Sequence, residues 1–504
     1  MPNYDNLSQH TFLPFEVHKI TTAKTFWVNY DLVRETFTQC NTMNDAQVDD
    51  FLIDNFAYMV PPEGVDFDKH FSQQTQTFYA ERYGSHSERS NGGGVRCGNH
   101  MGVQIKGTGK NLLANGWMDF WHTHGGASLE EGVREAIWGE FFHQNAPFGA
   151  ARILAVIRTG MDIDFDYNLE SKEDNKAPGA LMLRQPIVRP AHFERAHFFH
   201  NELPFDFYRV QDNCEKLNQI TGETESKAFI QRQIAYFSYL SAWLKVKRIA
   251  HGAITTGNIG VDGTMIDFGT TTSFLDHANY LISRGFPPFW GDHVYFSNIL
   301  STMNFYLGKY HSECFDKPKE IEELFFDSFN RYLSQFWLYQ TGFDGAFCKI
   351  ETPVHKRFSA GINLLAKACE ETQHTPQTFR VPLARYNVVN ILKILAEEKQ
   401  GITVEHLKTE IPEEKYAQHI VERFLDVLAA YDEWQAATGQ TGLKPLQVAC
   451  EERNRDLIRL TRNELFKDIT KKVEQDDDVR GWINEILQDS KLEPDNLPFE
   501  LEAC

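Results

Sequence analysis

The chain has 504 residues, of which 42% are hydrophobic and 13% aromatic, which is enough apolar material for a large buried core. Its formal net charge of −20 argues against a protein that coats nucleic acid or binds membranes through a polybasic surface. The length predicts two or three cooperating structural units.

Targeting and membrane signals are not found in the sequence. The first residues, MPNYDNLSQHTFLPFEVHK, lack the basic segment and apolar run of a signal peptide. No stretch approaches the roughly eighteen apolar residues of a membrane-spanning helix. The eight cysteines are scattered without a CxxC pair, which is typical of reduced thiols rather than of a disulfide framework or a zinc site. We therefore expect a cytoplasmic protein that neither inserts into membranes nor binds nucleic acid.

The first half of the chain predicts strands and one prominent helix. Residues 1–90 alternate strand-like runs such as TFWVNY with helical runs such as DAQVDDFLIDNFAYMV. The glycine-dense turn SERSNGGGVRCGN leads to MGVQIKG, in which Val103 and Ile105 alternate with polar neighbours as in a strand. SLEEGVREAIWGEFFHQ predicts a helix that begins at Ser128, with Glu131 at the capping-box spacing. AARILAVIRTG and DNKAPGALMLRQPIV predict further strands.

The second half is predominantly helical. ESKAFIQRQIAYFSYLSAWLKVKRIAHG predicts a long amphipathic helix that leads into a polar hairpin at 251–273. Aromatic-rich helices follow at 291–345, and charged amphipathic helices such as YNVVNILKILAEE begin near residue 375. The order predicts an α+β protein with the two-lobed layout of kinase-like folds and a ligand between the lobes. The expected parts are an N-terminal extension (1–90), a nucleotide-binding N-lobe (91–200), a helical C-lobe with the hairpin (201–370) and a helical C-terminal module (371–504).

Four polar side chains are suited to a nucleotide site. Lys106 ends its strand on the same side as Gln104, and Glu135 on the following helix is placed to pair with it. Such a pair holds an ammonium group against phosphate oxygens in phosphoryl-transfer enzymes. Asn258 and Asp267 flank the tight turn of the hairpin, and their oxygens suit Mg²⁺ or Mn²⁺. The pattern predicts a bound nucleotide and a divalent metal ion.

Glycines and histidines surround these positions. Gly107, Gly109 and Gly125, together with the glycines at 92–94, would let backbone N–H groups approach phosphates closely. The segment GTGK does not satisfy the P-loop pattern. The histidines of HTHGG and HFERAHFFH lack the acidic or thiolate neighbours of a metal site. Each residue alone also fits an ordinary surface or structural position, so the prediction rests on their order along the chain.

In this order the segments resemble the selenoprotein O family of adenylyltransferases with a pseudokinase fold, over roughly residues 80–310. IKGTGKN is similar to the family's LKGAG.TP, SLEEGVREAIWGE to VLRSSIREFL.SEA, and RPAHFE to R.GHFE. HGAITTGNIGVDGTMIDFG resembles HGVMNTDNMSILGLTIDYG, and GGVRCG resembles GDGRA. The resemblance implies an ATP-binding lysine with its glutamate partner (Lys106, Glu135), nucleotide-contacting arginines (Arg96, Arg189) and metal ligands (Asn258, Asp267).

Family members bind ATP in a reversed pose and transfer AMP, rather than phosphate, to protein hydroxyls. The resemblance therefore implies an ATP- and Mg²⁺-dependent nucleotidyltransferase that acts on a protein or peptide acceptor. A metal and a cationic clamp would stabilise attack at the α-phosphorus, with pyrophosphate as the leaving group. Cys504 in PFELEAC also resembles a redox-active residue near the end of family members.

The chain departs from the family pattern at positions that matter for chemistry. Gly257 replaces the aspartate thought to act as the base, and the family's GHQFG is not legible in YGSHSERSNG. His124 stands at another family aspartate, while Gly126 and Glu130 replace two arginines. Losing a general base lowers the rate about 10²–10⁴-fold when the acceptor is a neutral hydroxyl. His124 is the candidate replacement base.

These departures leave two alternatives open. An acceptor carboxylate is already an anion and needs no base, and its attack on ATP gives an acyl-adenylate for ester or amide formation. Such a reaction fits peptide modification with a partner enzyme, as in the maturation of siderophore-bearing microcins. The second alternative is a catalytically inactive pseudokinase scaffold.

Overall fold

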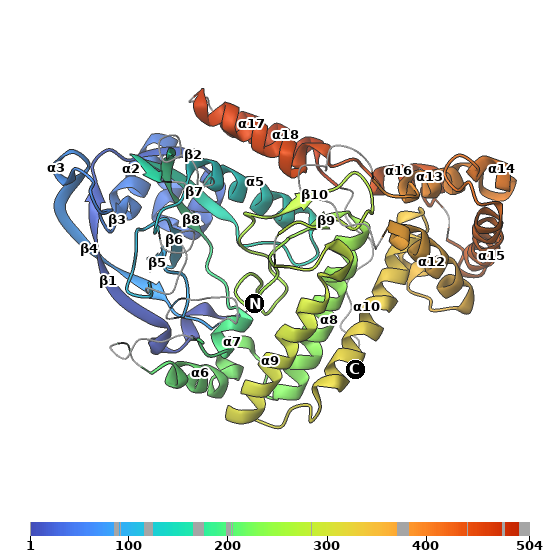
Figure 1. Ribbon diagram of the computed structural model, residues 1–504, viewed down its shortest axis with the longest axis horizontal. Coiled ribbons are helices and arrows are strands. Elements are labelled where there is room, and N and C mark those ends of the chain that lie inside the picture. Colours follow the sequence, from blue (N-terminus) through green and yellow to red (C-terminus); the bar gives the residue numbers. More distant parts are fainter. Residues whose placement is uncertain are drawn as a thin grey trace.

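A large antiparallel sheet with covering helices forms one end of the molecule, and a helical half forms the other (Figure 1). The computed structural model describes residues 2–84, 90, 92–114, 124–164, 176–197, 203, 205–283, 285–369, 383–440, 442–475 and 479–492. His122, His200, Cys504 and part of the glycine-dense turn lie outside these residues. The α+β prediction is confirmed.

The sheet has eight strands, and all of its neighbouring strands run antiparallel. The strands, in spatial order, are β2 (Lys24–Val28), β7 (Ile153–Asp164), β8 (Lys176–Arg184), β6 (Val103–Lys106), β5 (Cys97–His100), β4 (Phe71–Glu81), β1 (Phe12–Ile20) and β3 (Tyr58–Met59). The strands predicted in MGVQIKG, AARILAVIRTG and DNKAPGALMLRQPIV correspond to β6, β7 and β8, which are consecutive neighbours in the sheet.

The two faces of the sheet separate apolar from polar side chains of β6, as the alternation predicts. Val103 and Ile105 pack in a core with residues of α1 (Tyr30–Thr36) and α2 (Asp45–Phe56). Lys106 lies on the opposite face, where α5 (Leu129–Asn145) crosses β7 and β8. The strand therefore directs its lysine toward α5 because successive side chains of a strand point to opposite faces.

The N-terminal residues are part of the sheet rather than an extension beside it. They supply β1, β2, β3 and β4, half of the eight strands. β1 pairs with β4 from Phe12↔Glu81 to Ile20↔Phe71, and β2 pairs with β7. Their positions depend on pairing between strands far apart in the chain, which local alternation does not specify.

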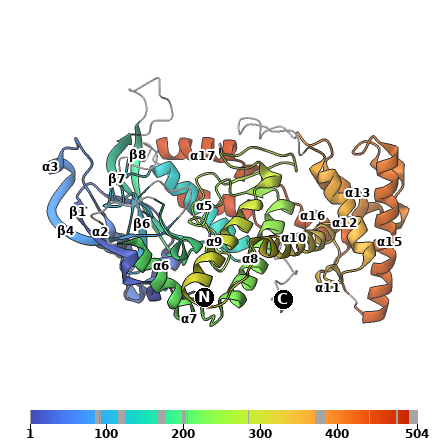
Figure 2. The ribbon, with the colours of Figure 1, turned by 60° about the horizontal axis from the view of Figure 1, so that its bottom comes forward.

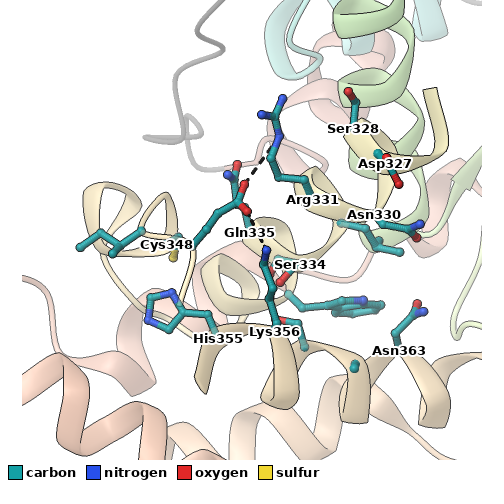
Figure 3. Close-up of a pocket in the computed structure, with 16 residues that line it drawn as sticks. Asp327, Ser328, Asn330, Arg331, Ser334, Gln335, Cys348, His355, Lys356 and Asn363 are labelled. Carbon is teal, nitrogen blue, oxygen red and sulfur yellow. Dashed lines mark hydrogen bonds and ion pairs between the residues drawn. The ribbon is translucent and has the colours of Figure 1, made fainter. Parts of the chain in front are cut away.

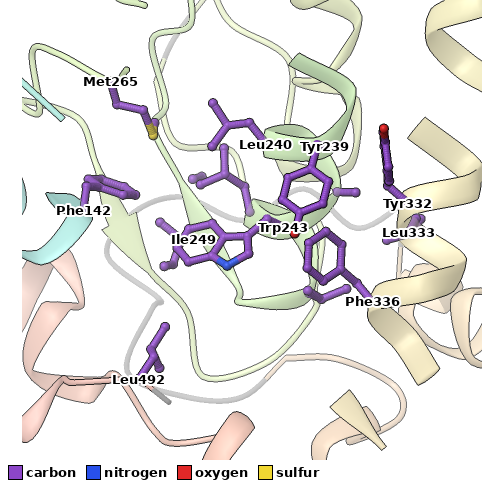
Figure 4. Close-up of a cluster of buried hydrophobic side chains, with 14 of the residues drawn as sticks. Phe142, Tyr239, Leu240, Trp243, Ile249, Met265, Tyr332, Leu333, Phe336 and Leu492 are labelled. Carbon is purple, nitrogen blue, oxygen red and sulfur yellow. The ribbon is translucent and has the colours of Figure 1, made fainter. Parts of the chain in front are cut away.

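The helical half is built around α8 (Ser226–Val246), which matches the predicted long helix and packs against α9 (Val294–Tyr310) and α10 (Pro318–Gln340). Figure 4 shows part of its core, in which Trp243 of α8 lies between Phe142 of α5 and aromatic side chains of α10. The rings of Phe142 and Trp243 are 6.4 Å apart, and those of Tyr239 and Phe336 are 4.9 Å apart. This core therefore joins α5 to the helical half.

The C-terminal helices form two groups (Figures 1 and 2). α13 (Val388–Glu398), α15 (Glu414–Thr438) and α16 (Leu446–Arg453) lie at the far end with α12 (Pro353–Ala366). α17 (Arg462–Glu474) and α18 (Val479–Asp489) return to pack on α5. The last helices are therefore neighbours of the sheet half and not only an appendage. The remaining short elements are α3 (Phe67–His70), α6 (Asp206–Glu215), α7 (Leu217–Thr221), α11 (Gly345–Cys348), α14 (Val404–Leu407), β9 (Ile249–Ala250) and β10 (Thr272–Ser273).

The cysteines and helices agree with the sequence expectations for the described part of the chain. Six cysteines are free thiols, namely Cys40, Cys97, Cys214, Cys314, Cys348 and Cys450. None of the helices in the described ranges has both the length and the apolar character that crossing a bilayer requires.

Candidate functional site

A polar cleft of about 420 Å³ lies where β6, α5, the 251–273 hairpin and α17 meet. It brings together five of the residues predicted from distant parts of the sequence, namely Arg96, Lys106, His124, Asn258 and Asp267. Its described lining contains more basic than acidic side chains, with Arg96, Lys106, Arg134, Arg184 and Arg462 against Glu130, Glu131 and Asp267. The cleft is therefore locally cationic in a strongly acidic chain, which favours an anionic ligand.

Lys106 is the centre of the cleft's ion pairs. Its Nζ lies 3.2 Å from Glu135 Oε1, so the predicted lysine–glutamate pair is present. The same Nζ lies 3.0 Å from Asp267 Oδ1 on the hairpin, which ties the sheet to the hairpin directly. Burial lowers the pKa of Lys106, but the surrounding carboxylates outweigh it and hold the pKa above its usual value. Lys106 is therefore a fixed cation.

Glu131 is a site residue that the sequence analysis treated only as a helix cap. Ser128 Oγ accepts a hydrogen bond from Glu131 N at 3.0 Å, so the predicted cap is present. The Glu131 carboxylate, however, pairs with Lys106 at 2.9 Å and accepts two hydrogen bonds from Arg96, at 2.9 and 3.0 Å. Glu131 and Glu135 are four residues apart, and that spacing places them on one face of α5. This spacing was the signal available in the sequence.

Glu135 also fixes the hairpin against α5. Its Oε1 accepts a hydrogen bond from the backbone N–H of Phe268 at 3.2 Å, and its Oε2 lies 3.9 Å from Arg184. Phe268 follows Asp267 in the chain, so this bond holds the backbone next to the predicted metal ligand. Glu135 therefore orients both the lysine and the hairpin.

The hairpin has the predicted tight turn. An isolated bridge pairs Ile259 with Met265, and the N–H of Gly263 donates to the carbonyl of Gly260 at 3.0 Å. Gly263 has φ +81°, and a Cβ there would lie 2.5 Å from the ring of Phe148, so glycine is required. Asn258 and Asp267 stand just outside the bridged pair, one on each arm.

Asn258 and Asp267 fit a magnesium ion through their oxygen atoms. The Asn258 side-chain N–H donates to the carbonyl of Ala253 at 3.0 Å, which leaves the amide oxygen as the atom that can face a metal. Asp267 adopts φ +68°, a conformation that asparagine and aspartate tolerate best among side chains with a Cβ. Two such oxygens, with phosphates and waters, satisfy Mg²⁺. Within the described ranges, no group of three or more His, Cys, Asp or Glu residues could hold a metal by itself.

Arg189 is placed differently from the prediction of a phosphate contact. Its side chain is 2% exposed and is not part of the described lining of the cleft. It donates to the carbonyl of Gly257 at 2.7 Å and to Gln104 Oε1 at 3.2 Å. In this structure Arg189 supports the hairpin from behind, because both terminal nitrogens of its guanidinium donate to other groups of the protein.

Three predicted phosphate-binding glycines also have structural roles here. The N–H of Gly107 donates to the carbonyl of Arg96 at 2.7 Å, and that of Gly109 to the carbonyl of Gly125 at 3.0 Å. All three glycines have positive φ, with no room for a Cβ. Two of the predicted glycines, Gly93 and Gly94, do line the cleft, together with Gly269, which was not predicted.

His124 lines the cleft, but its geometry does not favour a role as base. Its Nδ1 accepts a hydrogen bond from the backbone N–H of Gly126 at 3.2 Å. The neutral ring therefore carries its proton on Nε2 and presents a donor there. A donor can orient an anion, whereas a general base needs an unprotonated nitrogen.

A buried network behind the cleft is centred on Glu81 of β4. His192 Nε2 lies 2.8 Å from Glu81 Oε1, Arg189 Nε lies 3.8 Å from the same oxygen, and Gln104 donates to the other oxygen. Burial raises the pKa of Glu81, but Arg189 and His192 outweigh it and lower the pKa to about 2. Glu81 was not predicted from the sequence.

Acid is expected to destabilise this region. Opposing cations also lower the pKa of Glu131 to about 2 against the raising effect of burial. A carboxyl whose folded pKa lies below its ordinary value of 4.5 stabilises the protein above that pH and loses this contribution as pH falls from 4.5 toward 2. We expect the thermal unfolding midpoint to fall steeply below pH 4.5, and less steeply in Glu131→Gln. Unfolding is monitored by circular dichroism. If the midpoint falls with pH equally steeply in the wild type and in Glu131→Gln, the role of Glu131 is contradicted.

A second cavity, of about 590 Å³, lies between α10, α11 and α12 and contains none of the predicted residues (Figure 3). In its lining, Glu351 lies 3.8 Å from Arg331 and 3.0 Å from Lys356. Its described lining has two acidic and two basic side chains, so its charge is balanced. Although this cavity is larger, its charge gives no preference for an anion such as ATP. The smaller, cationic cleft is therefore the better candidate.

Comparison with known proteins adds no relative. No protein-family model matches the chain, and no curated protein matches it. The functional argument therefore depends on the cleft itself.

Proposed function

We propose that the cleft binds ATP with Mg²⁺ and transfers AMP to a protein or peptide acceptor. The observation that carries the proposal is the position of Lys106, paired with Glu135 of α5 and 3.0 Å from Asp267 of the hairpin. A strand lysine paired with a helix glutamate, next to an aspartate and an asparagine that can hold metal, is the arrangement that kinase-like enzymes use around nucleotide phosphates. The sheet half, the helical half and the cleft support a kinase-like fold for the same reason.

Some residues of the cleft would bind phosphate, and others would hold the metal ion. Lys106 and Arg96 would exchange the Glu131 carboxylate for phosphate oxygens, which carry a larger negative charge. Asn258 and Asp267 would hold Mg²⁺, which neutralises charge on the phosphates when it is bound. Arg134, Arg184 and Arg462 of the same cleft would stabilise charge on the leaving pyrophosphate.

Labelled ATP tests the proposal directly. The protein is incubated with Mg²⁺, a mixture of proteins and ATP labelled at either the α- or the γ-phosphate, and binding of ATP is measured by titration calorimetry. We expect the α-label, but not the γ-label, on acceptors, with pyrophosphate released, and no labelling when the metal is chelated. If the acceptors carry the γ-label, the protein transfers phosphate, and the proposed AMP transfer is contradicted. If the protein binds no ATP, the remaining candidate function is a catalytically inactive scaffold.

A further inference from the structure

Tyr83 occupies the space beside Gly257. At this position the resemblance implies a carboxylate, and the chain has a glycine in its place. A Cβ built on Gly257 would lie 3.3 Å from Cε2 and 3.9 Å from Cδ2 of the Tyr83 ring. The first distance is tighter than nine in ten contacts that real Cβ atoms make. Tyr83 also lines the cleft and is 8% exposed. The wall next to Asn258 is therefore an aromatic ring and not an acid.

Arg189 holds the ring and the glycine in this arrangement. Its guanidinium lies 4.8 Å from the centroid of the Tyr83 ring, within the range of a cation–π interaction. The same guanidinium donates to the carbonyl of Gly257 at 2.7 Å. Arg189 is buried and is also held by Gln104, and a side chain at position 257 would require the ring to shift by a few tenths of an ångström.

Two of the three acids in the described lining of the cleft are poorly suited to remove a proton. Asp267 and Glu131 are both paired with Lys106, whose Nζ lies 3.0 Å and 2.9 Å from their carboxylates. A carboxylate stabilised in this way is a weak base at neutral pH. His124, as described above, presents an N–H donor rather than an acceptor if its ring is neutral. Among the acids of the described lining, only Glu130 is not paired with Lys106, so an acceptor that must lose a proton finds few candidate bases.

The charge of the cleft suits an acceptor that is itself an anion. Its described lining has five basic and three acidic side chains, and two of the acids are already paired with Lys106. The cations that contact the triphosphate would also attract and orient an anionic acceptor group beside it.

We infer that Tyr83 and Gly257 select a carboxylate as the AMP acceptor, an inference that rests on the proposed function. A carboxylate oxygen of a peptide would attack the α-phosphorus of ATP and form a new C(O)O–P bond. The bond from the α-phosphorus to the oxygen bridging to the β-phosphate would break, and its electron pair would leave with pyrophosphate. The product is an acyl-adenylate, and no proton has to be transferred. Tyr83 acts here as a specificity-determining residue.

The acceptor class is tested with the wild-type chain and a tryptic peptide mixture, used either untreated or methyl-esterified so that every carboxylate is blocked. We expect pyrophosphate release, and hydroxamates after trapping with hydroxylamine, only with the untreated mixture. Stable AMP on hydroxyls of the esterified mixture would overturn the inference, and so would a chain that binds ATP and Mg²⁺ but reacts with neither mixture. A chain that binds no ATP would instead overturn the proposed function.

A matched pair of variants tests the role of position 257. Gly257→Asn and Gly257→Asp place side chains of the same shape against Tyr83 but differ in charge. An acceptor carboxylate is repelled by the aspartate, so we expect Gly257→Asp to be at least about tenfold slower in pyrophosphate release than Gly257→Asn. A hydroxyl acceptor gives the opposite order, because the aspartate supplies a base worth about 10²–10⁴-fold. Binding of ATP by both variants shows that they are folded, and a faster aspartate variant would overturn the inference.

Discussion

Replacing Asp267 with asparagine is expected to lower Mg²⁺-dependent AMP transfer by at least about 100-fold, because groups that merely support metal ligands already contribute 10–100-fold. Asparagine keeps the shape of the side chain and tolerates the φ of +68° at this position. It removes the negative charge that faces both Lys106, 3.0 Å away, and the proposed metal. The loss of activity should therefore result from the missing charge and not from a changed conformation of the hairpin. Activity is measured as pyrophosphate release across a magnesium titration.

Asp262 of the same hairpin provides the matched control. Its Oδ1 accepts a hydrogen bond from the N–H of Thr264 at 3.1 Å in the turn, and asparagine can accept the same bond. We expect Asp262→Asn to keep its activity and its dependence on magnesium. Activity of Asp267→Asn within threefold of the wild type at saturating magnesium would contradict the metal role of Asp267.

Local sequence patterns predicted the parts of the site that depend on neighbours in the chain. The alternation in β6 placed Lys106 on the face opposite Ile105, and Ser128 marked the start of α5. The turn residues of the hairpin predicted the fold between Asn258 and Asp267. Each of these features depends on a periodicity or a turn within a few residues, which is why the sequence contains it.

Features of the site that depend on residues far apart in the sequence could not be predicted from such local patterns. Arg462 belongs to a C-terminal helix, and only the return of α17 to α5 brings it to the cleft. Arg189 matched a family motif, but its contacts with Gly257 and Tyr83 depend on the packing of three separate segments. The strand pairing that builds half of the sheet from the N-terminal residues is likewise long-range. Burial of these polar groups is a property of the folded chain, not of a local pattern.

Among these residues with distant partners, Glu81 is the one whose replacement should destabilise the protein most. Replacing it with glutamine is expected to lower the free energy of unfolding by about 3–5 kcal/mol, the usual cost of removing one partner of a buried ion pair. The carboxylate is fully buried and faces the donor groups of Arg189, His192 and Gln104. A glutamine amide would leave Arg189 without its opposing charge and would turn N–H groups toward other donors.

Denaturation by urea, followed through tryptophan fluorescence, measures this loss. Glu16→Gln on the adjacent strand β1 is the matched control, because its carboxylate is 68% exposed and exposed substitutions usually change stability by less than about 0.5 kcal/mol. If Glu81→Gln unfolds at the same urea concentration as Glu16→Gln, the buried network does not stabilise the fold. The predicted loss should also reach the cleft, because Arg189 supports both Gly257 and Tyr83. At urea concentrations where Glu81→Gln remains folded, its affinity for ATP should therefore be lower than that of Glu16→Gln.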